Sequence, residues 1–274
     1  MRSTASRGVR PQIIAHRGAS GLRAEHTLAA YLQALDEGAD ALECDVRLTA
    51  DGHLVCLHDR RIERTSDGRG VVSTLELAEL DALDFGSWKH PWRELDDEDD
   101  DDPASYRLLT LEALLEAVLD SGRRVELAIE TKHPTRYAGV VEQRLVELLR
   151  RFRLTEPRPE DVVWVSVMSF SWLSLRRVHD LAPSLPTVYL MDRVPWRLGD
   201  GSLPLGCRTG GLAIEMVRAR PRLVRRLQRR GHQVHVFTVN DPADIRLCLA
   251  LGVDAIITDH PAETLALVTA SLRP

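Results

Sequence analysis

Short apolar runs alternate along the chain with amphipathic helical patterns, and this alternation predicts repeated strand–helix units. The first run, residues 13–15, is too short for a helix and stops at His16, Arg17 and Gly18. A run without polar alternation is typical of a parallel strand that is buried on both faces. A leucine-rich helical pattern follows over residues 28–35. Because reactive groups collect at the carboxyl edge of such sheets, we expect His16 and Arg17 at the mouth of a site.

Eight strand candidates recur in this alternation. They end near His16, Asp45, Glu130, Met168, Leu190, Ile214, Phe237 and Thr258. Eight strand–helix units specify a closed barrel, so the predicted fold class is an α/β TIM (β/α)8 barrel. An open doubly wound sheet is the structural alternative, but no strand is followed by the GxGxxG or phosphate-loop pattern of that class.

Residues 60–108 interrupt the alternation with glycines, a short helical run over residues 75–83 and an acidic stretch over residues 96–102. The acidic stretch lacks the spaced glycine and alternating ligands of a calcium-binding loop, so we interpret it as a solvated loop. The sequence thus predicts a flexible N-terminus over residues 1–11 and one barrel over residues 12–274, with a small insertion after the second strand.

Composition and charge exclude several classes of protein. The chain has 274 residues, of which 44% are hydrophobic and 28% charged, and its net charge is -5. This balance gives no electrostatic footprint for nucleic acid, no apolar run reaches membrane-spanning length, and the first residues lack the apolar core of a secretion signal. No CxxC pair is present, and Cys44 and Cys56 lie in strand-like runs where buried free thiols are expected. We therefore expect a cytoplasmic protein, and the sequence defines no oligomeric state.

Carboxylates cluster on neighbouring predicted strands. Glu43 and Asp45 are two residues apart on the second strand, so both point to the same face, and Glu130 stands near the end of the third. Like charges on one inward face repel each other unless a cation or a proton compensates them. Three carboxylates form an all-oxygen site that suits a hard dication better than zinc. The sequence therefore predicts that Glu43, Asp45 and Glu130 bind Mg²⁺ or Ca²⁺.

Histidines and cations accompany these carboxylates. His16 and His58 can accept and donate protons near neutral pH, while Arg17 and Lys132 offer positive charge to an anionic group. Together with a dication, these residues fit phosphoryl chemistry. Each pair also has an ordinary structural explanation, such as an exposed turn histidine or a surface ion pair between Glu130 and Lys132. Their convergence at the ends of three successive strands favours the functional interpretation.

Ordered motifs along nearly the whole chain resemble those of one enzyme family. They are His16-Arg17-Gly18-Ala19, Glu25-His26-Thr27, Glu43-Cys44-Asp45-Val46, His58-Asp59, Arg64-Thr65-Ser66-Asp67-Gly68, Thr110-Leu111-Glu112, Glu130-Thr131-Lys132, Phe237-Thr238-Val239-Asn240 and the run from Gly252 to Asp259. In this set the chain resembles the glycerophosphodiester phosphodiesterases. The resemblance implies a TIM barrel that hydrolyses small-molecule glycerophosphodiesters to glycerol 3-phosphate and an alcohol.

The resemblance also implies roles for individual residues. His16 and His58 correspond to an acid/base pair, Arg17 and Lys132 to phosphate contacts, and Phe237 to an aromatic wall beside the substrate. The implied metal ligands are Glu43, Asp45 and Glu130. The family's reaction is drawn with the substrate's glycerol hydroxyl as nucleophile, which gives a cyclic phosphate that water then opens. One histidine deprotonates the hydroxyl and the other protonates the leaving alcohol.

Three positions depart from the family pattern. Family members commonly have asparagine in place of His26, tryptophan in place of Phe237 and proline in place of Leu109. Phenylalanine keeps an aromatic wall but lacks the indole donor. None of the departures removes an implied metal ligand or acid/base group, so we expect activity.

Other functions fit parts of the same pattern. A lysophospholipase D-type phosphodiesterase needs an apolar groove for an acyl chain, which Phe85, Trp88 and Trp92 of the insertion could line, although capping the barrel is the more ordinary role for them. A non-catalytic anion-binding barrel is expected to lack a histidine or a ligand, and this chain lacks neither. Sugar isomerisation on the same fold does not require Arg17 and Lys132.

Overall fold

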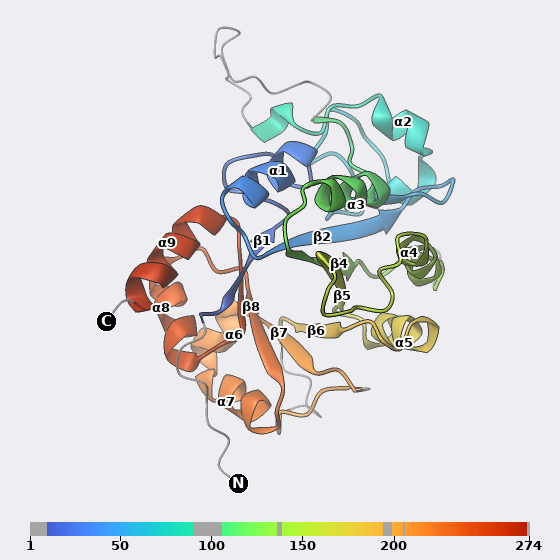
Figure 1. The fold of residues 1–274 in the computed structure, drawn as a ribbon. Coiled ribbons are helices and arrows are strands. Elements are labelled where there is room, and N and C mark those ends of the chain that lie inside the picture. Colours follow the sequence, from blue (N-terminus) through green and yellow to red (C-terminus); the bar gives the residue numbers. More distant parts are fainter. Residues whose placement is uncertain (1–9, 90–105, 136–138, 194–198, 205, 273–274) are drawn as a thin grey trace, which may run out of the picture.

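A closed barrel of parallel strands, surrounded by helices, forms the centre of the protein (Figure 1). The computed structural model describes residues 10–89, 106–135, 139–193, 199–204 and 206–272. The barrel strands in these ranges are β1 (Gln12–His16), β2 (Ala41–Leu48), β4 (Val125–Thr131), β5 (Val163–Ser169), β6 (Thr187–Met191), β7 (Thr209–Ala213), β8 (Gln233–Phe237) and β9 (Ala255–Thr258). Strand β1 pairs with both β2 and β9, which closes the sheet. The predicted eight-stranded barrel is confirmed.

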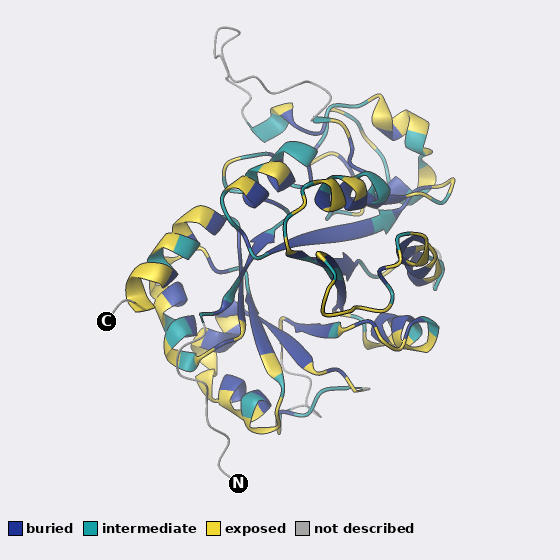
Figure 2. Ribbon diagram, viewed as in Figure 1, coloured by how far each residue is buried: buried dark blue, intermediate teal, exposed yellow. Residues whose placement is uncertain are grey.

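Helices bury one face against the barrel and expose the other (Figure 2). The described helices on the outside of the barrel are α1 (Leu28–Asp36), α3 (Leu111–Asp120), α4 (Val140–Arg151), α5 (Trp172–Leu181), α6 (Ile214–Ala219), α7 (Pro221–Arg229), α8 (Pro242–Leu251) and α9 (Pro261–Leu272). Between β6 and β7 the described residues form no helix, so the fifth unit departs from the predicted strand–helix alternation.

The sixth barrel strand, β7, also differs from the prediction at its end. Ile214 begins α6 instead of ending β7, and a second helix, α7, starts directly afterwards. Pro221 has no N–H to donate to the preceding turn, which separates the two helices at Arg220, and proline is favoured at the first position of a new helix.

Alternate residues along each strand point to opposite sides of the barrel wall. The apolar residues of the interior are Ile14, Ala41, Ala128, Met168, Val188, Leu190, Ala255 and Ile257. Their neighbours, such as Ile13 and Leu42, pack in the larger core that includes the helices. Further along β2 and β4, Asp45 and Glu130 lie in register. The barrel interior therefore changes from apolar to charged toward its carboxyl edge.

The segment after β2 has a small core of its own. Its elements are β3 (Leu54–Cys56), the short 3-10 turns Val72–Thr74 and Ser87–Lys89, and α2 (Leu77–Asp81). Strand β3 pairs antiparallel with β2, and Ile62, Leu80 and Phe85 belong to a buried cluster separate from the barrel core. Helix α2 is shorter than the helical run predicted over residues 75–83. The acidic stretch over residues 96–102 lies outside the described residues.

The first described residues are tied to the barrel. Arg10 donates hydrogen bonds to both carboxylate oxygens of Asp40, at 2.5 and 2.7 Å. Residues 1–9 lie outside the described ranges, so the flexible N-terminus over residues 1–11 stays a prediction. None of the described helices has both the length and the apolar composition that a membrane crossing needs.

Candidate active site

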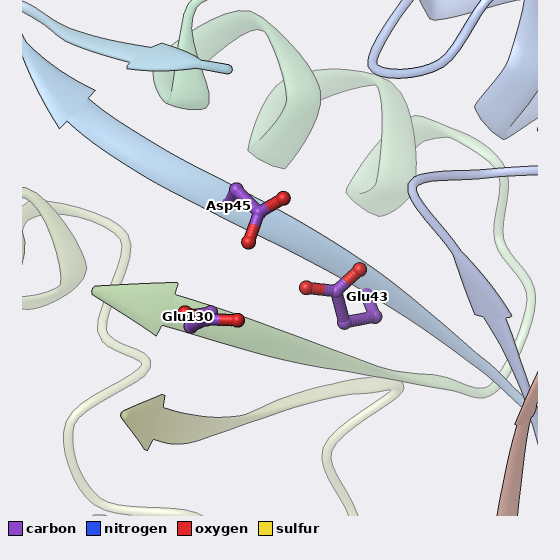
Figure 3. Close-up of side chains that lie close together, drawn as sticks. All are labelled: Glu43, Asp45 and Glu130. Atoms are coloured by element: carbon purple, nitrogen blue, oxygen red, sulfur yellow. The ribbon is translucent and has the colours of Figure 1, made fainter. Parts of the chain in front are cut away.

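Three buried carboxylates meet near the carboxyl ends of β2 and β4 (Figure 3). Glu43 and Asp45 are alternate residues of β2, and Asp45 lies in register with Glu130 of β4. One oxygen of each carboxylate lies within 4.8 Å of the other two. The fold thus brings together the three residues that the sequence predicts as metal ligands.

The three carboxyl groups do not ionise independently. Burial raises the pKa of Glu43 well above its ordinary value, and the neighbouring Asp45 and Glu130 raise it further. Burial and Asp45 likewise raise the pKa of Glu130 to about 8. Burial also opposes ionisation of Asp45, but Lys132 and His26 outweigh it and hold the pKa of Asp45 well below its ordinary value. A cation placed among the three carboxylates would therefore stabilise their ionised forms.

Two cationic side chains border the carboxylates. Lys132 Nζ lies 3.0 Å from Asp45 Oδ1 and 2.9 Å from Glu130 Oε1. The backbone N–H of Arg17 donates to Glu43 Oε2 at 3.0 Å, and Arg17 Nε lies 3.2 Å from Asp45 Oδ2. This Nε is buried and has no hydrogen-bond partner among the described residues. Apart from its ion pair with Asp45 this donor is unsatisfied, which is uncommon for a buried N–H group.

A tight turn after β1 places Arg17 beside the carboxylates. Arg17 adopts a left-handed backbone with a φ of 57°, and Gly18 follows with a φ of 83°. A Cβ atom on Gly18 would lie 2.6 Å from the carbonyl carbon of Ala30, so only glycine fits there. Left-handed backbone at a residue other than glycine costs about 1–3 kcal/mol and is concentrated at functional sites. The conformation of Arg17 agrees with a binding role.

His16 ends β1 and is held by residues from the far end of the chain. Its Nδ1 lies 2.7 Å from Oδ1 of Asp259, which follows β9. Ser20 donates a hydrogen bond to the same oxygen, and Asn240 donates one to Oδ2. The contact with Asp259 thus fixes the orientation of the imidazole through Nδ1 and leaves Nε2 as the ring nitrogen not engaged by this carboxylate.

His58 follows β3 and has a similar carboxylate partner. Its Nδ1 lies 2.7 Å from Asp59 Oδ1, and Arg47 donates two hydrogen bonds to its backbone carbonyl. Burial lowers the pKa of His58 to about 4, against the opposing effect of Asp45. The imidazole of His58 is therefore uncharged at neutral pH and can accept a proton.

His26, one of the three departures from the family pattern, is almost fully buried. Its Nδ1 lies 2.8 Å from the Tyr31 hydroxyl, and its Nε2 lies 2.9 Å from Asp45 Oδ2. Burial lowers the pKa of its imidazole. His26 therefore orients Asp45, a contact that sequence spacing did not indicate because the turn after β1 creates it.

Aromatic side chains extend from the barrel interior to the surface beside the site. Phe237 ends β8 and packs against the apolar interior cluster. Phe170, directly after β5, meets Phe237 edge to face with ring centroids 5.7 Å apart, and it is 41% exposed. The sequence singled out Phe237 but not Phe170. Phe85 is instead buried in the core of the insertion and its carbonyl accepts the indole N–H of Trp88, while Trp92 lies outside the described residues.

The donor set of the three carboxylates fits a hard dication. It consists of oxygen only, it is buried, and two of its carboxyl groups resist ionisation without added positive charge. Arg17 and Lys132 add two cations beside it, which is the combination that a phosphate group requires. The arrangement can therefore hold a metal ion and an anionic ester together.

Comparisons with known proteins show what the chain resembles. The Glycerophosphoryl diester phosphodiesterase family matches residues 16–263. A Mycobacterium tuberculosis protein named probable glycerophosphodiester phosphodiesterase 1 is 45% identical over 256 residues, which cover 93% of this chain and 92% of the relative. The glycerophosphodiester phosphodiesterase of Bacillus subtilis is 34% identical over 254 residues, which cover 90% of this chain and 83% of the relative.

Solved structures share the fold. A phosphodiesterase of Oleispira antarctica, solved in complex with the product sn-glycerol-3-phosphate, superposes with a TM-score of 0.79 at 28% identity. The match covers 95% of this chain and 97% of the other. The similarity therefore extends over the whole barrel and includes the segments that carry the carboxylates.

Proposed function

Because this chain belongs to the glycerophosphodiester phosphodiesterase family and is a hydrolase of that class, we propose that it uses Mg²⁺ or Ca²⁺ to release glycerol 3-phosphate. The metal ligands in this proposal are Glu43, Asp45 and Glu130. The single observation that carries it is the meeting of these buried carboxylates with two cationic side chains, Lys132 and Arg17. The proposed catalytic unit is the barrel over residues 12–274, including its insertion.

Arg17 and Lys132 bind the phosphate in the proposed mechanism. The Nε of Arg17, which makes no hydrogen bond in the described residues, and the ammonium of Lys132 neutralise charge on the non-bridging oxygens, and more so as charge develops in the transition state. A dication held by the three carboxylates would add Lewis-acid polarisation of the ester. Phe237 forms an apolar wall that excludes water on one side of the substrate.

His16 and His58 move the protons. One accepts the proton of the substrate's glycerol hydroxyl as that oxygen attacks phosphorus, and the other donates a proton to the oxygen of the leaving alcohol. The cyclic phosphate formed is then opened by water, with the two histidines in exchanged roles. In each case Nδ1 is held by a carboxylate, of Asp259 or Asp59, so the opposite nitrogen is the one that faces the reaction.

A lysophospholipase D-type reaction is the second candidate, and one observation favours it. Phe170 extends the aromatic wall of Phe237 outward and remains 41% exposed, so an apolar leaving group could rest on it. A lysophospholipase D of Mus musculus is 26% identical over 269 residues.

We also propose a cytoplasmic location, since the cysteines of the chain are free and buried.

The test is release of glycerol 3-phosphate from glycerophosphocholine by the purified protein. We expect activity that EDTA removes and that Mg²⁺ or Ca²⁺ restores, with the better ion identifying the cofactor. Lysophosphatidylcholine as a second substrate separates the two candidates, because only the second predicts choline release from it. Activity that persists in EDTA would contradict the metal-dependent mechanism.

A further inference from the structure

Arg64, on the insertion, joins two carboxylates that each hold a different group of the site. Its Nε donates to Asp59 Oδ2 at 2.6 Å. Its two terminal nitrogens donate to the two oxygens of Glu25, each at 2.7 Å. A planar guanidinium makes this set of three bonds, whereas a lysine ammonium at the end of a flexible stem cannot reproduce it.

Each carboxylate carries the contact to a proposed functional group. Asp59 Oδ1 lies 2.7 Å from Nδ1 of His58, and Glu25 Oε1 accepts a hydrogen bond from Arg17 at 2.9 Å. Burial opposes ionisation of both carboxyls, but hydrogen bonds from Arg64 outweigh it and lower the pKa of each to about 2. Both carboxylates are therefore charged and paired with Arg64 at neutral pH.

The same arginine connects the insertion to the barrel. The insertion packs around its own apolar cluster, which is separate from the barrel core. It reaches the segment between β1 and α1 through the pair of Arg64 and Glu25 and through Lys89, whose ammonium donates to the Ser20 carbonyl at 2.8 Å. The backbone of His58 is fixed to the barrel by the pairing of β3 with β2 and by Arg47. The contacts of Arg64 and Lys89 add a second connection, on the side where the imidazole of His58 and the guanidinium of Arg17 lie.

We infer that Arg64 is a positioning residue for the phosphodiesterase reaction, because it holds His58 and Arg17 in register through Asp59 and Glu25. This inference rests on the roles proposed above for His58 and Arg17. The hydrogen bonds of Arg64 go to Asp59 and Glu25 and not to His58 or Arg17, so its effect passes through the two carboxylates. Loss of such an orienting partner typically costs about 10- to 100-fold in activity.

The test compares Arg64→Ala and Arg64→Lys with a matched control, Arg61→Ala. Arg61 lies on the same segment, is exposed and pairs with Glu63. We expect Arg64→Ala to lower kcat/KM for glycerol 3-phosphate release about 10- to 100-fold, with a lower kcat as well as a higher KM, while Arg61→Ala keeps wild-type values. Arg64→Lys is expected to remain impaired, and added guanidinium chloride is expected to restore part of the activity of Arg64→Ala but none to Asp59→Asn.

A mutant cycle separates positioning from general loss of stability. If Arg64 acts through the two carboxylates, Arg64→Ala adds no further loss in a background of Asp59→Asn and Glu25→Gln. Additive losses, or wild-type kinetics in Arg64→Ala, would overturn the inference. If Arg64→Ala does not unfold cooperatively, Arg64→Lys carries the test, and full activity in that variant overturns the inference. An inactive wild-type protein contradicts the proposed function instead.

Discussion

Asp259 Oδ1 lies 2.7 Å from Nδ1 of His16, although 243 positions separate the two residues in the sequence. Strand β9 pairs with β1, and this pairing brings the end of the chain back to its beginning. Ser20 and Asn240 each donate a hydrogen bond to Asp259, so the carboxylate is itself fixed before it orients the imidazole.

Replacement of Asp259 by asparagine is expected to lower kcat about 10- to 100-fold, because the imidazole of His16 loses the partner that fixes its orientation and tautomer. Initial-rate measurements on glycerophosphocholine check this expectation. Glu263→Gln is the control, since Glu263 is an exposed carboxylate in the first turn of α9, close in sequence but outside the site. Equal kcat values in Asp259→Asn and the wild type would show that His16 does not need this partner.

The buried carboxylates are expected to bind one dication per chain. Glu43→Gln should weaken binding of Mg²⁺ or Ca²⁺ in isothermal titration calorimetry by more than about 100-fold, because even residues that only orient a ligand typically contribute 10- to 100-fold. Glu126→Gln is the matched control. Glu126 lies four residues before Glu130 on β4, but it bonds Gln12 and Ser166 at the opposite end of the barrel. Equal affinities in the two variants would remove Glu43 from the ligand set.

Glu25 is expected to make folding stability depend on acid pH. Burial opposes its ionisation, but Arg64 and Arg17 lower its pKa from 4.5 to about 2. A carboxyl group whose pKa is lowered on folding stabilises the protein above its unfolded pKa, and that stabilisation is lost as pH falls through the folded value. The control is Glu116→Gln, since Glu116 is an exposed carboxylate of α3. As pH falls from 4.5 to about 2, the melting temperature should therefore decrease less steeply in Glu25→Gln than in the wild type or in Glu116→Gln. Parallel slopes in all three proteins would contradict the assigned ion pairs.

Gly18 is expected to be irreplaceable for a reason of space as well as of backbone conformation. Gly122 also has a positive φ, of 62°, but a Cβ atom there would meet nothing within 4 Å. Gly122→Ala should therefore cost about 1–2 kcal/mol of unfolding free energy from its backbone alone. Gly18→Ala adds contact with Ala30 and should cost at least about 1 kcal/mol more, and it should also weaken phosphate binding by Arg17. Chemical denaturation measures the free energy of unfolding of both variants. Equal losses in Gly18→Ala and Gly122→Ala would contradict the close approach of Gly18 to Ala30.

Periodicity explains which parts of the site the sequence could predict. Glu43 and Asp45 share a face because strand side chains alternate, and Glu130 joins them because its strand lies next to theirs in the barrel order. Such relationships need only a strand assignment and a topology. The motif resemblance supported the same residues independently.

The parts that could not be predicted depend on contacts between distant segments or on loop geometry. Arg64 meets Glu25 across 39 positions, and nothing in the local pattern around either residue indicates the pair. Phe170 lies in a turn just outside β5, where no strand periodicity assigns it a direction. Hydrophobic periodicity also does not resolve the lack of a helix among the described residues between β6 and β7, or the division of α6 from α7 at Pro221.

The central claim is that His16 and His58 transfer the protons of phosphodiester hydrolysis, and one set of variants tests it most directly. Rates of glycerol 3-phosphate release at saturating metal should be compared for His16→Ala, His58→Ala and the control His53→Ala, whose histidine side chain is 53% exposed in the hairpin before β3. We predict that each of the first two lowers kcat by about 10²- to 10⁴-fold, while His53→Ala keeps the wild-type rate. Wild-type rates in His16→Ala or His58→Ala, with the metal still bound, would contradict the mechanism.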